Sequence, residues 1–218
     1  MRALRSASSQ ERKHRGGGLS FLQCSASRCF QGLTVGNSPV SSMKIDINGR
    51  LCGGLFVSSP NCDARPPGLI DLLVIHSISL PPGMYGGGEV ELLFTNQLDE
   101  AAHPYFAQIS GLRVSAHFFI RRNGALVQFV SCLERAWHAG ASCWQGRGGC
   151  NDFSIGIELE GLDFLPFENA QYETLVDLTR ALRAVYPLRG IAGHSDIAPG
   201  RKTDPGSGFD WLKYLSVV

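Results

Sequence analysis

Long apolar runs are missing from this sequence. No stretch of its 218 residues approaches the roughly 18 to 20 consecutive apolar residues that a helix needs to cross a bilayer. A secretory signal peptide requires an apolar segment after its basic start, and none follows residues 1–5. The sequence therefore predicts neither a transmembrane helix nor export by that route, and we expect a cytoplasmic protein.

A strong charge bias is also missing. The formal net charge is only +1, but it conceals a division along the chain. Residues 1–42 carry six Arg and Lys against Glu11 alone, whereas residues 43–218 carry 14 basic and 18 acidic residues. The larger part therefore has no excess of basic residues, and nucleic-acid binding is not indicated.

Residues 1–42 also lack a sustained hydrophobic period and are rich in Ser, Gly and Gln. Such composition is typical of disordered segments, and the Arg and Ser bias also fits a transit peptide. We interpret these residues as a disordered basic leader outside the fold, with an upstream start codon as an alternative origin. Residues 43–218 are expected to form one domain, because two full domains would be cramped in this length.

Paired cysteine motifs are absent as well. Seven cysteines form an odd set without a Cys-x-x-Cys pair. In a chain without a secretory signal, such residues indicate reduced core thiols rather than a disulfide framework. Cys143 and Cys150 stay open as candidates for a nucleophile or a metal ligand.

Residues 193–206 form the segment with the most concentrated chemistry. They combine one imidazole, two carboxylates and two cations with prolines and glycines that exclude a helix or a central strand. Neutral imidazole and carboxylate are zinc ligands, and three protein ligands leave a fourth position for water. If His194 and Asp204 are two ligands, the third comes from elsewhere. A solvated loop whose Asp residues cap turns is the alternative.

A second histidine follows a hydrophobic segment. Residues 69–75 are almost continuously apolar, which is typical of a strand covered on both faces. His76 comes next, where the chain leaves the predicted strand, and catalytic groups tend to lie there in open α/β sheets. A core histidine with a backbone partner is the simpler interpretation.

Residues 154–160 alternate with a period of two. This places their apolar side chains in a core and Gly156, Glu158 and Glu160 on the opposite face. Two carboxylates beside a glycine are unfavourable for packing and suit the floor of a site. A half-exposed edge strand is the alternative.

Further patterns complete the predicted fold. Residues 114–121 and 125–130 alternate around an Asn-Gly turn, which predicts a β-hairpin. An amphipathic helix is expected from Asn169, as its N-cap, to residue 186, with shorter helices at 89–94 and 209–215. The sequence predicts an α/β, single-domain protein with a central mixed β-sheet flanked by helices, the hairpin supplying the antiparallel part.

Three other residues are candidates for a site. His117, at the centre of a predicted strand, fits a hydrogen-bonded neighbour of a metal ligand better than a ligand. An indole face packs well against sugars, so Trp137 is a candidate wall, while His138 beside it points inward or to solvent. Tyr105 lies in the long connection 77–112, and such connections are usually binding loops or lids.

Five motifs taken together resemble one family. From about residue 50 to the C terminus, in the same order and spacing, the chain is similar to the AmpD-type zinc amidases, the 1,6-anhydro-N-acetylmuramyl-L-alanine amidases of bacterial cell-wall recycling. The motifs are LLVIHSISLPPG at 72–83, VSAH at 114–117, AWHAG at 136–140, CNDFSIGIELEG at 150–161 and residues 193–206.

The resemblance implies a role for each candidate residue. His76, His194 and Asp204 would hold one Zn²⁺ per chain, Glu158 would be the general acid and base, and Lys202 would stabilise developing negative charge. Substrate would bind along Tyr105, Arg113 and Trp137. The family fold is an α/β domain with a mixed sheet, shared with phage amidases and peptidoglycan recognition proteins. Ser77 departs from close relatives, which have Asn after the first ligand.

The reaction implied by the resemblance is hydrolysis of the amide between the lactyl group of anhydro-N-acetylmuramic acid and the L-alanine of the stem peptide. The expected partners are small soluble anhydromuropeptides, with neither nucleic acid nor membrane, and the expected state is a monomer. Three alternatives remain: an exported amidase acting on polymeric peptidoglycan, a muropeptide-binding module without catalysis, and a cysteine hydrolase that uses Cys143 or Cys150.

Overall fold

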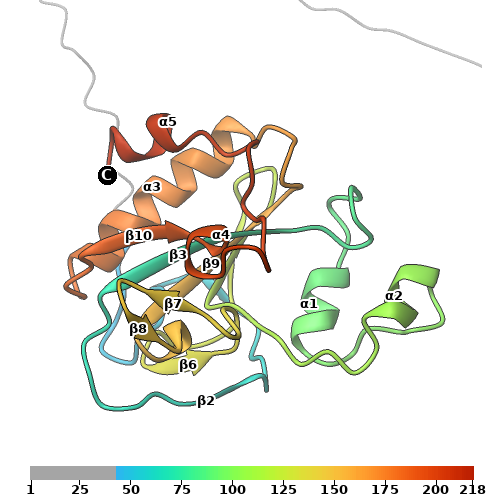
Figure 1. Cartoon of the computed structure of the whole chain (residues 1–218), viewed down its shortest axis with the longest axis horizontal. Helices are drawn as coiled ribbons and strands as arrows, with labels where there is room; N and C mark the ends of the chain where they lie inside the picture. The colour runs from blue at the N-terminus through green and yellow to red at the C-terminus, as the bar shows by residue number, and fades with distance from the viewer. Residues whose placement is uncertain (1–42) are drawn as a thin grey trace, which may run out of the picture. The chain divides into compact units, whose positions relative to one another are not determined.

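A six-stranded mixed β-sheet organises residues 43–218, the part of the chain that the computed structural model describes (Figure 1). The expected leader, residues 1–42, lies outside the described residues. Only β4 and β5 pair antiparallel within this sheet, as the hairpin pattern predicts. The strands in spatial order are β1 (Leu55–Phe56), β5 (Leu126–Gln128), β4 (Phe118–Ile120), β9 (Ser154–Glu160), β3 (Leu72–Ile78) and β10 (Gly190–Gly193).

Strands β3 and β9 form the centre of the sheet. All seven residues of β9 are buried, so the interpretation of this segment as a half-exposed edge strand is wrong. Strand β3 begins at Leu72, where its parallel pairing with β9 and β10 begins, and Leu69 is 55% exposed. The strand continues to Ile78, so His76 lies inside it rather than after its end.

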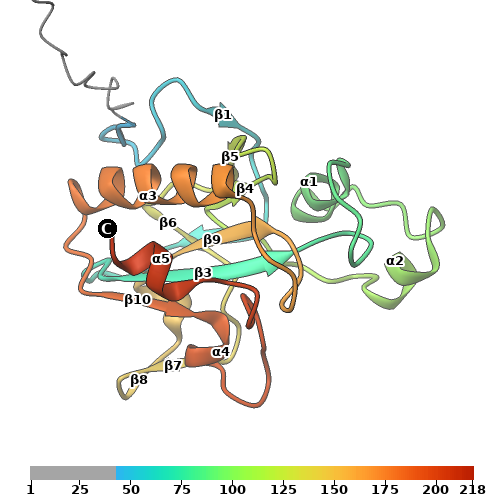
Figure 2. The same ribbon diagram turned by 90° about the horizontal axis from the view of Figure 1, so that it is seen from above.

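Helix α3 (Asn169–Arg183) covers one face of the sheet, and the small sheet of β7 (Cys143–Trp144) and β8 (Arg147–Gly148) lies on the other (Figure 2). The N-cap of α3 is Glu168 and not Asn169. The backbone N–H of Glu168 donates to the Gln171 side chain at 3.0 Å, whereas the Asn169 side chain accepts a hydrogen bond from Lys213. The buried side of α3 packs into the main core with the inward residues of β3 and β9.

The connection after β3 carries two helices beyond the carboxyl ends of the central strands (Figure 2). Helix α1 (Glu89–Phe94) has the predicted bounds. Helix α2 (Pro104–Gln108) was not predicted from the sequence; Pro104 occupies its first turn, and the His103 side chain accepts from the backbone N–H of Tyr105 at 3.1 Å. Both helices contribute to a second core with β4 and β5.

Three short elements complete the described chain. Helix α4 (His194–Ile197) is one helical turn before Pro199, so the expectation that prolines exclude any helix from residues 193–206 is wrong for its first residues. Helix α5 (Trp211–Leu215) begins two residues later than predicted, because Asp210 caps it. Strand β2 (Cys62–Ala64) pairs with β6 (Glu134–Ala136) outside the main sheet. None of the helices described between residues 43 and 218 combines the length and apolar character needed to cross a membrane.

Candidate metal centre

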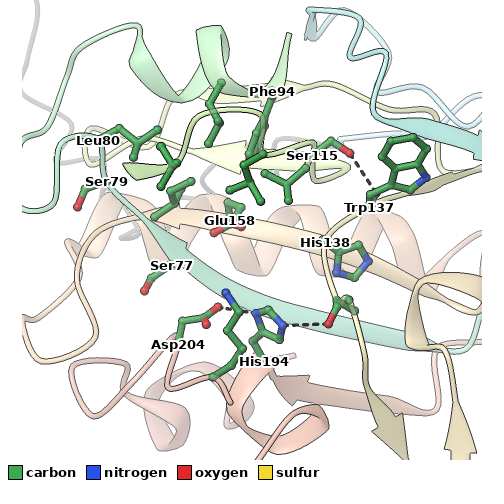
Figure 3. A pocket seen from close by; sticks show the side chains of 18 of the residues that line it. Ser77, Ser79, Leu80, Phe94, Ser115, Trp137, His138, Glu158, His194 and Asp204 are labelled. Atoms are coloured by element: carbon green, nitrogen blue, oxygen red, sulfur yellow. Dashed lines mark hydrogen bonds and ion pairs between the residues drawn. The ribbon is translucent and has the colours of Figure 1, made fainter. Parts of the chain in front are cut away.

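Three side chains from two distant parts of the sequence meet at one edge of the sheet. His76 lies near the end of β3, and His194 begins α4 directly after β10, the parallel neighbour of β3. Asp204 follows in the next loop and points toward His194 (Figure 3). Parallel pairing brings the carboxyl ends of β3 and β10 together, which accounts for the meeting of the two histidines.

The three polar atoms form a nearly equilateral triangle. His76 Nδ1 lies 2.9 Å from His194 Nδ1 and 3.2 Å from Asp204 Oδ2, and His194 Nδ1 lies 3.0 Å from the same oxygen. Protons cannot satisfy all three contacts, since two N–H groups that donate to the carboxylate would repel each other. A cation accepts an electron pair from each atom. In tetrahedral zinc sites, bonds of about 2.0 to 2.2 Å place the ligand atoms roughly 3.3 to 3.6 Å apart, slightly farther than these three atoms are from one another.

This cluster could therefore hold a metal ion, and it is the one group of its kind found among residues 43–218. Burial lowers the pKa of His76 to about 4, so its imidazole is neutral near pH 7, as a metal ligand must be. Burial alone would raise the pKa of Asp204, but its contacts with His194 and His76 outweigh burial and hold that pKa below its usual range. The set thus offers two imidazoles and one carboxylate.

Glu158 stands beside this cluster. It is the register partner of His76 on the adjacent strand β9, and its exposed fraction is 9%. Within the described part of the chain, its Oε2 is buried without a hydrogen-bond partner. Burial, reinforced by the charge of Asp204, raises its pKa well above 4.5. A carboxyl group with a raised pKa and a free oxygen is suited to accept and then donate a proton.

Glu160 does not share this site, although the alternation placed it on the same face as Glu158. Its carboxylate accepts hydrogen bonds from the backbone N–H of Gly86 at 2.5 Å and of Arg122 at 2.9 Å. It therefore holds two loops at the end of β9. Of the two carboxylates expected on a site floor, only Glu158 lies there.

A pocket of about 530 Å³ opens above the cluster (Figure 3). His76 lies beneath it and is 1% exposed. The apolar side chains of its wall come mainly from residues 78–114, the end of β3 and the connection after it, and Trp137 and two cations of the 193–206 loop also line it. The other predicted site residues all line this pocket: His194, Asp204, Glu158, Lys202, Tyr105, Arg113 and Trp137.

The segment 136–140 supports the cluster from below. Its Ala139 carbonyl lies 3.2 Å from His194 Nε2 and also accepts from the Arg201 guanidinium at 2.7 Å. His138, for which the sequence left the direction open, points inward, with its Nδ1 2.9 Å from His76 Nε2. Space for its ring comes from Gly156, because a Cβ there would lie 2.5 Å from His138 Cγ. The sequence pattern singled out Gly156, but it predicted the space beside this glycine for the carboxylates of Glu158 and Glu160 rather than for the ring of His138.

Other candidates lie outside the metal cluster. His117 is fully buried, accepts from the Gly156 N–H at 3.0 Å, and lies edge-on to His138 with ring centroids 5.7 Å apart. It thus packs next to His138, but among the described residues the hydrogen-bond partners of its ring are Arg65, Glu134 and Gly156 rather than a residue of the cluster. Cys143 is exposed, Cys150 is buried, and neither lines the pocket, so nothing favours a cysteine hydrolase.

Several known proteins that are similar to this chain are amidases of one family. The N-acetylmuramoyl-L-alanine amidase family profile matches residues 65–207. The 1,6-anhydro-N-acetylmuramyl-L-alanine amidase AmpD of Escherichia coli K12 is 54% identical over 173 residues, which cover 78% of this chain and 94% of the relative. A crystal structure of a selenomethionine AmpD derivative matches with a TM-score of 0.79 and 52% identity, over 81% of this chain and 99% of that one.

A more distant structure contains a ligand. It is AmpDh3 from Pseudomonas aeruginosa in complex with anhydromuramic pentapeptide, with a TM-score of 0.51 and 28% identity, over 68% of this chain and 59% of that one. The profile match spans well over half of the chain, and the relatives share its fold as well as its sequence. This chain belongs to the N-acetylmuramoyl-L-alanine amidase family.

Proposed function

We propose that residues 43–218 form a zinc-dependent N-acetylmuramoyl-L-alanine amidase domain. Its reaction is hydrolysis of the amide between the lactyl group of 1,6-anhydro-N-acetylmuramic acid and the L-alanine of a stem peptide, in cytoplasmic peptidoglycan recycling. The observation that carries the proposal is the triangle of His76, His194 and Asp204 beside the unpartnered carboxyl of Glu158. The 54% identity to AmpD supports the choice of substrate.

His76, His194 and Asp204 would hold the zinc ion. Three protein ligands of this kind are typical of catalytic zinc sites, which keep a fourth position for water or substrate. When bound, zinc lowers the pKa of a coordinated water to about 7 and polarises a carbonyl group. His76 and His194 are buried, so the surrounding side chains hold their rings in place. The ligand set would therefore be formed before substrate enters.

Glu158 would act as the general base and then as the general acid. Its free Oε2 accepts a proton from the attacking water, and the raised pKa lets the carboxyl keep that proton until the amide nitrogen leaves. It then delivers the proton to the departing amine of L-alanine. General acid–base catalysis by one positioned group contributes typically 10²- to 10⁴-fold to the rate.

Lys202 would stabilise the negative charge that develops on the carbonyl oxygen. It lines the pocket two residues before Asp204, which brings its ammonium group to the same rim. Loss of one donor to such an oxyanion costs about 3 kcal/mol of transition-state stabilisation. Lys202 therefore acts on the rate of the chemical step rather than on the protonation of the leaving group.

Tyr105, Arg113 and Trp137 would bind the rest of the substrate. The two aromatic faces suit a sugar ring and acyl groups, and the Arg113 guanidinium suits a carboxylate of the stem peptide. The complex of AmpDh3 with anhydromuramic pentapeptide supports a small muropeptide as the ligand. We propose that the enzyme acts as a monomer without nucleic acid or membrane.

The test is peptide release from a purified anhydromuropeptide, followed by mass spectrometry. We expect release that stops with a chelator and returns when zinc is added. Intact sacculi serve as the second substrate: faster release from them would favour an exported amidase acting on polymeric wall. Tight muropeptide binding without release from either substrate would instead indicate a binding module and would contradict the proposal.

A further inference from the structure

A line of hydrogen bonds leads from the backbone of the 3₁₀ turn at Cys150–Asp152 to the metal cluster. The Ser154 hydroxyl donates to the Cys150 carbonyl at 2.6 Å, because a carbonyl can only accept. Its single proton is then used, so at the 3.1 Å contact with His138 Nε2 the hydroxyl accepts and the ring nitrogen carries the proton. A neutral His138 protonated at Nε2 has an unprotonated Nδ1.

The same assignment follows from the opposite end of the line. A ring nitrogen that binds a metal carries no proton, so a His76 that binds through Nδ1 is protonated at Nε2. That Nε2 lies 2.9 Å from His138 Nδ1, with the two rings at 87° to each other. The donor on His76 therefore meets the acceptor on His138. Two independent constraints give one consistent set of protons.

His138 is itself held in place on three sides. The Asn151 side chain accepts from the backbone N–H of His138 at 3.2 Å and of Ala139 at 2.8 Å. The ring occupies the space left by Gly156, as the 2.5 Å approach of a Cβ at that position demonstrates. Its exposed fraction is 8%. A ring fixed in this way can orient its neighbour.

We propose that His138 is the positioning residue of the metal centre: its Nδ1 accepts the Nε2–H of His76 and so presents His76 Nδ1, unprotonated and correctly oriented, to the zinc ion. The inference rests on the proposed function. It assigns His138 a role that acts through His76, although the His138 side chain also lines the pocket. Outer partners of metal-binding histidines are usually carboxylates or carbonyls, and here the partner of His76 is a second imidazole, itself fixed by Ser154.

His194 provides an internal reference. Its Nε2 lies 3.2 Å from the Ala139 carbonyl, so its outer partner is a backbone group that side-chain substitution leaves in place. Changes at His138 are therefore expected to alter the hydrogen bond of His76 and to leave that of His194 as it is. A general loosening of the site would alter both.

The experiment compares His138→Asn with His138→Leu. The two new side chains have nearly the same shape, and only Asn offers an acceptor oxygen on the atom that corresponds to imidazole Cγ. We expect the zinc dissociation constant, measured by competition with a chromophoric chelator, to rise roughly 10- to 100-fold in His138→Leu and to stay within about threefold of wild type in His138→Asn. His103→Asn is the control, because it removes a histidine that caps α2 and keeps a capping oxygen.

A second measurement uses the unaltered protein. In zinc-loaded, ¹⁵N-histidine-labelled wild type, we expect a ¹⁵N–¹⁵N scalar coupling across the hydrogen bond between His76 Nε2 and His138 Nδ1. A protonated His138 Nδ1 would overturn the inference, as would equal zinc affinity in the Asn and Leu variants. A wild type that binds no zinc would instead overturn the proposed function, so the two failures are distinguishable.

Discussion

His76 and Glu158 are direct partners in the register of the parallel strands β3 and β9. A proposed metal ligand and a proposed proton carrier are therefore held side by side on the two central strands of the sheet, both buried. Sites built on rigid strands keep their geometry more closely than sites built on loops. A substitution of Glu158 that leaves His76 in place therefore tests the proton carrier separately from the metal ligand.

Glu158→Gln is expected to abolish turnover and to leave metal binding intact. Gln keeps the shape of Glu but cannot carry the proton, so the rate should fall by about 10²- to 10⁴-fold. Rates of peptide release and zinc content by atomic spectroscopy check the two halves of this prediction. A variant with near-normal rates would remove Glu158 from its role; one that has lost zinc would assign it to the metal site instead.

Lys202→Ala is expected to lower kcat by roughly 100-fold with little change in KM, because the lost donor contacts the developing oxyanion and not the bound substrate. Lys213→Ala is the matched control, since Lys213 lies on α5 and bonds to Asn169 far from the pocket residues. Steady-state kinetics on an anhydromuropeptide compare the two. A rise in KM alone would mean that Lys202 binds substrate in its ground state.

Removal of metal is expected to lower thermal stability. A ligand that binds only the folded state stabilises it by about 2.7 kcal/mol when its free concentration is 100 times the dissociation constant. For a chain of this size, 1 kcal/mol shifts the melting temperature by roughly 2 to 4 °C. Thermal scans with zinc, with chelator and with zinc restored measure the shift. A melting temperature indifferent to all three would contradict a metal bound by His76, His194 and Asp204.

Acid is expected to destabilise the metal-free protein through His117. Burial lowers the pKa of His117 from 6.5 to about 3. As the pH drops below 6.5, His117 is therefore protonated in the unfolded chain before it is protonated in the folded one, and the free energy of unfolding falls. By pH 5 the free energy of unfolding should have fallen by about 2 kcal/mol because of His117. Urea unfolding at pH 7 and pH 5 measures it.

The comparison variant for that measurement is His117→Asn, which keeps an acceptor for the Gly156 N–H but does not titrate. Its loss of stability between pH 7 and pH 5 should be smaller than that of wild type by the same amount. Equal losses in the two proteins would show that other groups determine the acid sensitivity.

Local sequence patterns predicted the elements of the fold well where burial repeats regularly. The alternation at 154–160, the Asn-Gly turn of the hairpin and the bounds of α1 are each set by neighbours in sequence. Helix α2 was missed, because its short length leaves no period to detect. The N-cap of α3 was assigned one residue late, since both Glu168 and Asn169 carry an acceptor.

The site depended on information that no local pattern holds. Alternation predicted that Glu158 and Glu160 lie on the same face of the strand. It could not predict the loops at the end of β9, whose backbone N–H groups donate hydrogen bonds to Glu160 and not to Glu158. The convergence of His76 with His194 requires the pairing of β3 with β10, more than a hundred residues later. The family resemblance named in advance the three residues that form the cluster, whereas the inward direction of His138 appeared only in three dimensions.

The Ala139 carbonyl joins two parts of the pocket at a single atom. It lies 3.2 Å from His194 Nε2 and accepts a hydrogen bond from Arg201 at 2.7 Å, while Trp137 is two residues earlier in the same backbone segment. The backbone segment that carries Trp137 and the loop that carries His194 and Arg201 are thus linked through this one carbonyl. Selectivity in this enzyme should accordingly arise from exclusion of ill-fitting muropeptides at the entrance rather than from reshaping around whatever enters.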